Sequence, residues 1–538
     1  MLGKHFWLVV PWTTPAVALT ALLATTALSS EEHVHQALGK VHFPVTCGVE
    51  AQATFDEAMK LQHSFWHEAA ITKYQEVLKR DPSCVMAYWG QALALLDNPF
   101  SPPPAKNLAE GLSALEAAQK IGPKTQREAD YIDAMLAFYR DHDKLDHRTR
   151  VLAFEQAMET LAARYPDDPE ARIYYALALN MAASPTDKTY AKPLKAADIL
   201  EAEWQRQPEH PGVAHYLIHT YDFQPLAPKG MKAAELYSEI APDAPHALHM
   251  PSHIFTRVGH WEQSVASNSK SAEIARKDGS VGNELHALDY MVYAHLQLGQ
   301  VEAARQILKD LDRFANVDLN RVSLSRAAVF AMAAIPARVV MERGAWEEAA
   351  TLQPRKTVFP VADALTHYTR AVGFARSGKP DQATADIAAL KEKVDALRGK
   401  DAYWMEQVDI QRQAAEAWEA FAKGNRENAL DGMRSAADRE GKTEKHVITP
   451  GPLAPAREQL GEMLLDMNRP GDALKEFEAV QQTEPNRFRA IYGTARAAEM
   501  LGNRETAKQH YGKLIAITAK ADAARPEVTM AKAFMAAN

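Results

Sequence analysis

The chain has 538 residues, of which 47% are hydrophobic and 24% are charged, and its net charge is −8. Because it carries no basic excess, we expect no nucleic-acid partner. Its length exceeds what a single core supports, and its low glycine content, 25 residues, favours helices.

Residues 1–30 differ from the rest of the chain. Lys4 precedes an apolar run that reaches Leu28, and small residues follow. This pattern predicts a signal peptide that is cleaved between Ala27 and Ser30, and the alternative is an uncleaved membrane anchor. No later segment is apolar enough to span a bilayer. We therefore expect an exported protein, periplasmic or secreted, in which residues 31–49 form an N-terminal extension.

Two cysteines, Cys47 and Cys84, lie near the start of the expected mature chain. In an oxidising compartment they could pair as a disulfide, and the alternative is two buried thiols. Neither has a second cysteine at CxxC spacing, so a cysteine metal site is not expected.

A helical pattern begins near residue 50. The segment "HSFWHEAAITKYQEVLKRDPSCVMAYWGQALALL" (63–96) predicts two helices, with Asp81-Pro82 ending one and starting the next. Proline-rich stretches at 98–107 and 448–458 are the expected irregular interruptions.

Nine of the 20 histidines lie between His210 and His295. Some of them fall into three sets at helical spacing, and each set predicts one stripe along a helix. The sets are His215, His219 and Asp222; His246, His249 and His253; and His286, Asp289 and Tyr293.

Pro251 lies inside the second set. A proline in a helix interior removes a backbone donor and clashes with the preceding turn. If a helix begins at Pro251 instead, His246 and His249 lie on a loop, from which they could still reach a shared site.

The last hundred residues contain a repeat. The segments "PGDALKEFEAVQQTEP" (470–485) and "NRETAKQHYGKLIAIT" (503–518) align with an offset of 34, pairing Ala473 with Ala507 and Phe477 with Tyr511. Upstream, a glycine is repeatedly followed five residues later by a small residue, as at Gly299 and Ala304. A helix-turn-helix unit with this period resembles the tetratricopeptide repeat family.

This resemblance implies an all-α fold, a right-handed superhelical solenoid of stacked helix-turn-helix repeats. Repeats would occupy residues 50–445, with a histidine-rich groove at 210–295, and C-terminal repeats would occupy 446–538. In the family's register all three residues of the second set, and all three of the third, face the groove. The motifs "HPGVAHYLIHTYD" and "HALHMPSHIF" also resemble those of exported bacterial tetratricopeptide proteins of similar length.

Three hypotheses follow for function. The first is an exported scaffold that binds a peptide, protein or small ligand in the His/Asp-lined groove. The second is a metal-binding protein or metalloenzyme, an oxidoreductase or hydrolase, that holds zinc, copper or iron. Its ligands would come from His215, His219, His246, His249, His253, His286 and Asp289. The third is a purely architectural protein with packed histidines. No HExxH motif is present, so the sequence favours binding over catalysis.

Overall fold

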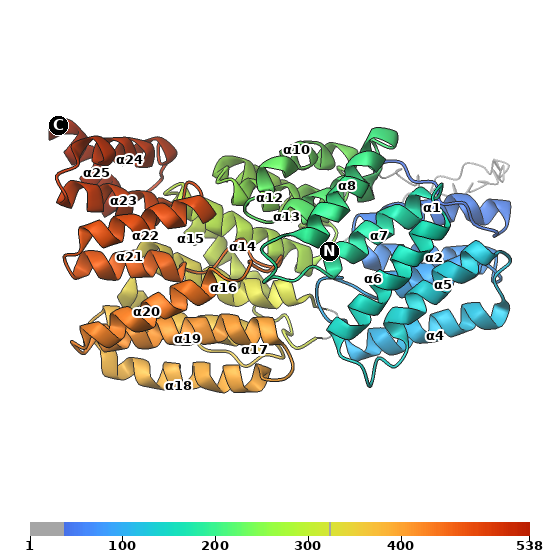
Figure 1. The fold of residues 1–538 in the computed structure, drawn as a ribbon, viewed down its shortest axis with the longest axis horizontal. Helices are drawn as coiled ribbons and strands as arrows, with labels where there is room; N and C mark the ends of the chain where they lie inside the picture. Colours follow the sequence, from blue (N-terminus) through green and yellow to red (C-terminus); the bar gives the residue numbers. More distant parts are fainter. Residues whose placement is uncertain (1–36, 322–323, 538) are drawn as a thin grey trace, which may run out of the picture. The chain divides into compact units, whose positions relative to one another are not determined.

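The structure is a computed structural model that describes residues 37–321 and 324–537. The expected signal peptide therefore lies outside the described residues. The described chain is entirely helical, and consecutive helices pack against each other in pairs (Figure 1). The all-α array of stacked helix pairs expected from the sequence is confirmed. Among the described residues, no helix combines the length and apolar character needed to cross a bilayer.

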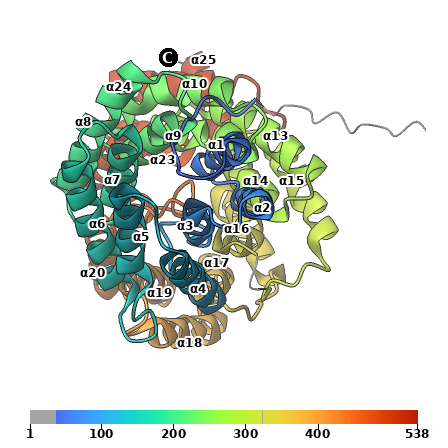
Figure 2. The same ribbon diagram turned by 90° about the vertical axis from the view of Figure 1, so that its right-hand side faces the viewer.

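The first part of the array runs as far as Tyr221. Its helices are α1 (Val49–His63), α2 (His67–Arg80), α3 (Val85–Ala94), α4 (Ala105–Ile121), α5 (Gln126–Tyr139), α6 (His147–Arg164), α7 (Pro169–Met181), α8 (Ala191–Arg206) and α9 (Pro211–Tyr221). Figure 2 shows α5, α6, α7 and α8 side by side, each in contact with the next.

The middle part contains the predicted histidine sets. Its elements are η1 (Ala227–Gly230), α10 (Met231–Ile240), α11 (Pro245–His249), α12 (Pro251–Arg257), α13 (Trp261–Lys277), α14 (Val281–Gln297), α15 (Val301–Asp310), η2 (Leu311–Phe314) and α16 (Arg326–Arg343).

The last part completes the array. Its elements are η3 (Trp346–Thr351), α17 (Pro360–Arg376), α18 (Pro380–Leu397), α19 (Ala402–Ala422), α20 (Arg426–Glu440), α21 (Ala456–Asp466), α22 (Pro470–Thr483), α23 (Phe488–Met500), α24 (Arg504–Ile517) and α25 (Pro526–Ala537).

The glycine turns behave as the sequence pattern requires. Gly259, Gly299 and Gly502 have φ angles of 71°, 69° and 74°, in the left-handed region that glycine adopts at little cost. The small residues that follow them are buried where two helices cross, as Ala304 and Ala507 are. This local chemistry fixes the repeat and positions the helices that carry the histidines.

Cys47 and Cys84 are joined by a disulfide bond, with their Cα atoms 4.9 Å apart. The bond attaches the segment before α1 to the start of α3. Both cysteines of the chain are used in this bond.

One irregular segment, residues 441–455, lies between α20 and α21, and we call it the bridging loop. It includes part of the predicted interruption at 448–458. Its Glu444 accepts hydrogen bonds from Lys188 and Tyr190 over 2.7 and 2.8 Å. Both donors lie about 250 residues earlier in the chain. Its Lys445 donates to Asp222 over 3.0 Å. The bridging loop therefore connects the C-terminal helices with the region of the histidine sets.

Candidate metal centre

Six of the predicted histidines come together in the middle of the array, and we call them the six-histidine cluster. They are His215 and His219 on α9, His246 and His249 on α11, His253 on α12, and His286 on α14. They form two groups in which one nitrogen of each residue lies within 4.8 Å of the others. The first triad is His215, His219 and His246, and the second triad is His249, His253 and His286.

Pro251 does begin a new helix, but the stripe survives. Met250, between α11 and α12, keeps helical angles of φ −54° and ψ −36°. Its N–H donates to the His246 carbonyl over 2.9 Å, which continues the helical pattern up to the proline. His246, His249 and His253 therefore follow one helical path, and neither of the first two lies on a loop.

In the first triad, His215 lies between the other two rings. Its Nε2 is 3.2 Å from Nε2 of His219 and 3.2 Å from Nε2 of His246. Its Nδ1 lies 2.7 Å from the backbone carbonyl oxygen of His63, which can only accept, so Nδ1 carries the proton. The lone pair of His215 Nε2 therefore points toward the other two histidines.

In the second triad, the orientation of two rings is fixed from outside. His249 Nδ1 donates to Asn268 Oδ1 over 2.6 Å, and His253 Nδ1 donates to Asp222 Oδ2 over 2.9 Å. The Asn268 amide group donates in turn to the Ser264 carbonyl, which fixes its orientation. The two Nε2 atoms lie 3.0 Å apart, and both present lone pairs. His286 completes this triad, with its ring centroid 4.3 Å from that of His249.

Burial keeps these imidazoles neutral. Desolvation lowers the pKa of His215, His219, His246, His249 and His286 well below 6.5, and the neighbouring histidines lower it further. Desolvation also lowers the pKa of His253, although Asp222 opposes this shift. Neutral imidazole is the form that binds a metal ion.

The arrangement leaves a position for a cation. Two lone pairs that face each other at 3.0 Å repel, and no proton is available between His249 and His253 because both Nδ1 atoms carry one. A metal ion bound by two nitrogens at about 2.0–2.1 Å with tetrahedral angles holds them about 3.3–3.4 Å apart. The distances of 3.0 to 3.2 Å in both triads are close to this value. Ligating histidines also commonly donate their other N–H to a carbonyl or carboxylate oxygen, as three of these do.

A third group, His63, Glu170 and His210, meets the same distance limit but needs no ion. Glu170 accepts from Nε2 of His63 over 3.0 Å and from Nε2 of His210 over 2.9 Å. Their remaining nitrogens accept from the Tyr216 hydroxyl and the Val213 N–H. Each polar atom in this group has a partner, so the Glu170 group is a buried hydrogen-bond network.

A cavity of about 100 Å³ opens onto the six-histidine cluster. Its walls include Phe65, His67, Asp97 and Phe100 together with His219, His246, His253 and His286. The Phe65 ring packs edge-on against His215, at a centroid distance of 4.3 Å, and Phe100 lies 4.5 Å from His219. The cluster is therefore reached through a small opening with aromatic walls.

The other predicted site residues lie outside the triads. Asp222 holds His253 and is itself bound by Arg257 and Lys445. Asp289, which the stripe placed among the metal ligands, instead forms a buried ion pair with Arg338 at 2.7 Å. The hydroxyl of Tyr293 accepts from Arg487 over 3.0 Å. The stripe fixed which face these residues occupy, but the charged partners on neighbouring helices decide what they bind.

The burial of the histidines also bears on the groove hypothesis. His215, His219, His249 and His253 are buried, with at most 6% of their surface exposed. Side chains this deep offer no contact surface to a peptide in an open groove. The peptide-binding interpretation of these four residues is therefore not supported by their position.

Sequence reasoning missed Asn268 and Glu170, although one signal for Asn268 was present. Ser264, Asn268 and Ser271 form a polar stripe on α13, and all three are fully buried. A buried polar stripe needs partners, and here the Asn268 side chain meets His249.

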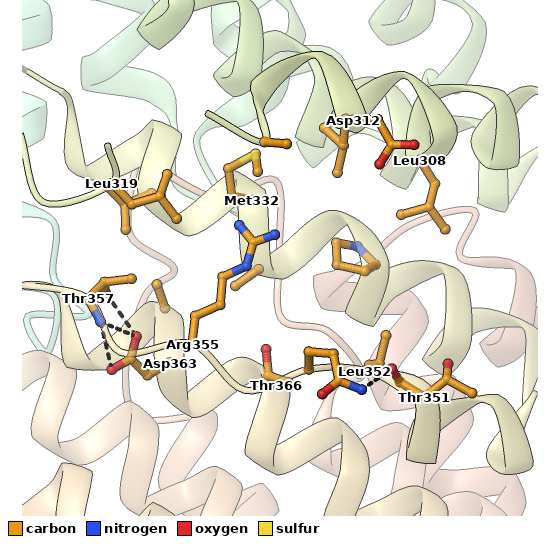
Figure 3. Close-up of a pocket in the computed structure, with 17 residues that line it drawn as sticks. Leu308, Asp312, Leu319, Met332, Thr351, Leu352, Arg355, Thr357, Asp363 and Thr366 are labelled. Carbon is orange, nitrogen blue, oxygen red and sulfur yellow. Dashed lines mark hydrogen bonds between the residues drawn. The ribbon is translucent and has the colours of Figure 1, made fainter. Parts of the chain in front are cut away.

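A larger cavity of about 270 Å³ lies elsewhere, between η2, α16, η3 and α17. Its lining is mostly apolar, and the Arg355 side chain extends into it near Met332 (Figure 3). At its edge, the N–H and the hydroxyl of Thr357 both donate to the Asp363 carboxylate. None of the predicted site residues lines it.

Comparison with known sequences gives one family match. A model of the tetratricopeptide repeat matches residues 66–124, from the start of α2 to just beyond α4. No curated protein sequence gives a match to the chain. Tetratricopeptide repeats form extended surfaces that bind other proteins.

Solved structures also match the chain, at low similarity. The tetratricopeptide domain of P58(IPK) is 10% identical, with 91% of this chain and 99% of that chain covered and a TM-score of 0.21. A Rap protein complexed with competence and sporulation factor is 13% identical, with 88% and 99% covered and a TM-score of 0.35. The human IFIT1 dimer with PPP-AAAA is 14% identical, with 81% and 91% covered and a TM-score of 0.32.

Proposed function

We propose that the six-histidine cluster binds transition-metal ions and that the helical repeats are the scaffold that holds it. The observation that carries this proposal is the pair of Nε2 atoms of His249 and His253, 3.0 Å apart with both Nδ1 protons directed at oxygens. Imidazole ligands suit zinc, copper and iron.

The opening beside the cluster supports access by a small molecule. A catalytic metal keeps an open coordination position, whereas a structural metal is closed by four ligands. Each triad offers three imidazoles and lies next to the cavity that contains His219 and His286. We therefore propose that, if the bound metal is catalytic, the protein is an oxidoreductase or a hydrolase.

The test is elemental analysis of tag-free protein by plasma mass spectrometry. Wild-type protein is compared with the His249→Ala/His253→Ala double variant and with His260→Ala, a matched control at an exposed histidine outside the cluster. We expect near-stoichiometric metal in the wild type and the control, and a loss in a double variant whose circular dichroism remains helical. A wild type that takes up no zinc, copper or iron(II) on soaking would overturn the proposal.

Protein binding and export are further parts of the proposal. The repeat match at residues 66–124 supports a protein partner, since such repeats build binding surfaces. The leader-like sequence of residues 1–30 and the disulfide between Cys47 and Cys84 support an oxidising, exported location. Co-purification after cross-linking in the exported fraction tests the partner, and fractionation tests the location.

A further inference from the structure

We infer that the two triads bind two copper ions as one dinuclear centre, and that this centre takes dioxygen as its ligand. The inference rests on the proposed metal function and specifies the number of ions, the element and the class of ligand.

The geometry favours two ions over one. Within each triad, one nitrogen of every histidine lies within 4.8 Å of those of the other two. Among the described residues, no larger group that meets this limit combines histidines of both triads. The triads are nevertheless adjacent. The ring centroids of His219 and His253 are 6.0 Å apart, and so are those of His246 and His249. Two ions held this close can share a bridging ligand, as in two-metal sites with ions about 3.5–4 Å apart.

The donor set favours copper. All six ligands are imidazoles, and neither triad includes a carboxylate. The nearest acidic partner, Asp222, contacts the outer nitrogen of His253 and is already bound by Arg257 and Lys445. Neutral ligands do not compensate the charge of a buried ion, so two monovalent ions cost less than two divalent ones. Copper(I) is the monovalent transition ion that imidazole binds, whereas manganese sites favour oxygen ligands.

No thiol competes for this ion. Both cysteines of the chain are joined in the disulfide. Copper(I) prefers soft thiolate ligands where they are present. Because the folded protein offers no free thiol, these ligands do not draw copper(I) away from the imidazoles.

The cavity leaves room for a small ligand beside the triads. Its volume of about 100 Å³ admits a molecule of a few atoms. Phe65 and Phe100 line the cavity and pack against His215 and His219 of the first triad. Phe65 has φ 52° and Asp97 has φ 54°, and both line the cavity. Backbone held in this costly region by residues other than glycine is often found at functional sites.

Dioxygen fits both the opening and the two-ion arrangement. Each copper(I) would have three nitrogen ligands, and two histidines of each triad line the cavity: His219 and His246, and His253 and His286. On binding, each copper(I) loses one electron and becomes copper(II), and dioxygen gains both electrons and is held as peroxide between the ions. No proton is transferred, and no other reductant is consumed. Release of dioxygen returns both electrons to the two ions.

The experiment loads the metal-free full chain with copper(I) without air and counts the bound ions. Dioxygen is then admitted, and the charge-transfer absorption and the electron paramagnetic resonance of copper(II) are recorded. We expect two copper ions per chain, a new absorption band on oxygenation and a silent resonance spectrum, because two bridged copper(II) ions couple. His219→Ala and His286→Ala, which each remove one ligand from one triad, should reduce the count from two ions to one and abolish the band. His260→Ala should change neither.

The outcomes separate this inference from the proposed function. Protein that binds no metal of any kind contradicts both. One copper ion per chain, two ions with the resonance of isolated copper(II), or preferential uptake of zinc from an equal mixture overturns the dinuclear copper centre alone. Two copper ions without any response to dioxygen overturn the ligand assignment.

Discussion

Asp222 accepts a hydrogen bond from His253 Nδ1 over 2.9 Å, and the same carboxylate is bound by two cations, Arg257 and Lys445. One carboxylate therefore orients a candidate metal ligand and also pairs with two buried cations. Desolvation raises the pKa of this carboxyl, but the neighbouring cations outweigh it and hold the pKa well below 3.8. Asp222 thus stays ionised while it holds the imidazole ring in place.

Replacing Asp222 should weaken metal binding. Loss of a carboxylate that orients a ligating histidine typically costs about 10–100-fold in metal affinity, so we expect this decrease for Asp222→Asn. Asp289→Asn is the matched control, because it also breaks a buried ion pair, with Arg338, but outside the triads. Competition with a coloured chelator measures both affinities. Equal affinities in the two variants would contradict the role of Asp222.

The Glu170 group should contribute to stability without affecting metal content. Glu170→Gln leaves a buried N–H facing an N–H donor of His63 or His210. An unsatisfied buried polar group costs about 1–3 kcal/mol, so the free energy of unfolding should fall by that amount. Urea unfolding measures the decrease, and plasma mass spectrometry should give the wild-type metal content. Loss of metal from this variant would make the Glu170 group a third metal site.

The disulfide should be a large contribution to stability. On the chain-entropy model, closing a loop at a separation of 37 residues contributes about 4 kcal/mol. We expect Cys47→Ser/Cys84→Ser to lose about this much in urea unfolding. Wild-type protein in a reducing agent should unfold at a similar midpoint, which separates loss of the bond from the effect of the serines. No change in either experiment would show that the bond is absent in solution.

Acid should destabilise the metal-free protein. Burial, together with the charges of Arg150 and Lys445, lowers the pKa of His147 and His446 to about 4. Between pH 6.5 and 4 the unfolded chain therefore binds protons that the folded chain does not, so the free energy of unfolding falls as the pH falls. Urea midpoints across this range measure the effect.

A His147→Gln/His446→Gln variant is the control for this pH dependence. Because it removes both groups, its midpoint should decrease less steeply with falling pH than that of the wild type. Identical slopes would assign the acid sensitivity to other groups.

The N-terminus should be processed. If residues 1–30 are a signal peptide, the mass of the protein from the exported fraction corresponds to a chain that starts after a position between Ala27 and Ser30. Intact-mass spectrometry measures this directly, with protein expressed in the cytoplasm as the uncleaved reference. A full-length mass in a membrane fraction would favour the anchor.

The repeat and the histidine stripes could be predicted from the sequence because they depend on neighbours in the chain. Gly299 adopts the expected left-handed angle, and Ala304, five residues later, is buried at a helix crossing. The second set stays on one helical path across Pro251 because only one backbone donor is lost there. Period and turn chemistry are sufficient for this level of structure.

The partners of the histidines could not be predicted, because they come from distant helices. His215 directs its Nδ1 at the carbonyl of His63, 152 residues away, and His253 meets Asp222, 31 residues away. Asp289 shares a stripe with His286, yet its carboxylate binds Arg338 on α16. A periodic pattern gives the face of a helix, whereas the distance between two helices depends on side chains that pack from outside the pattern.

The bridging loop changes how the array should unfold. In a simple repeat protein each unit contacts only its neighbours, so stability is nearly a one-dimensional sum and the ends can unfold first. Here Glu444 is bonded to Lys188, and Lys445 to Asp222, across more than 220 residues. Unfolding on either side breaks these bonds between the bridging loop and residues 188 and 222. We therefore expect the helices on the two sides to lose structure together in one cooperative transition.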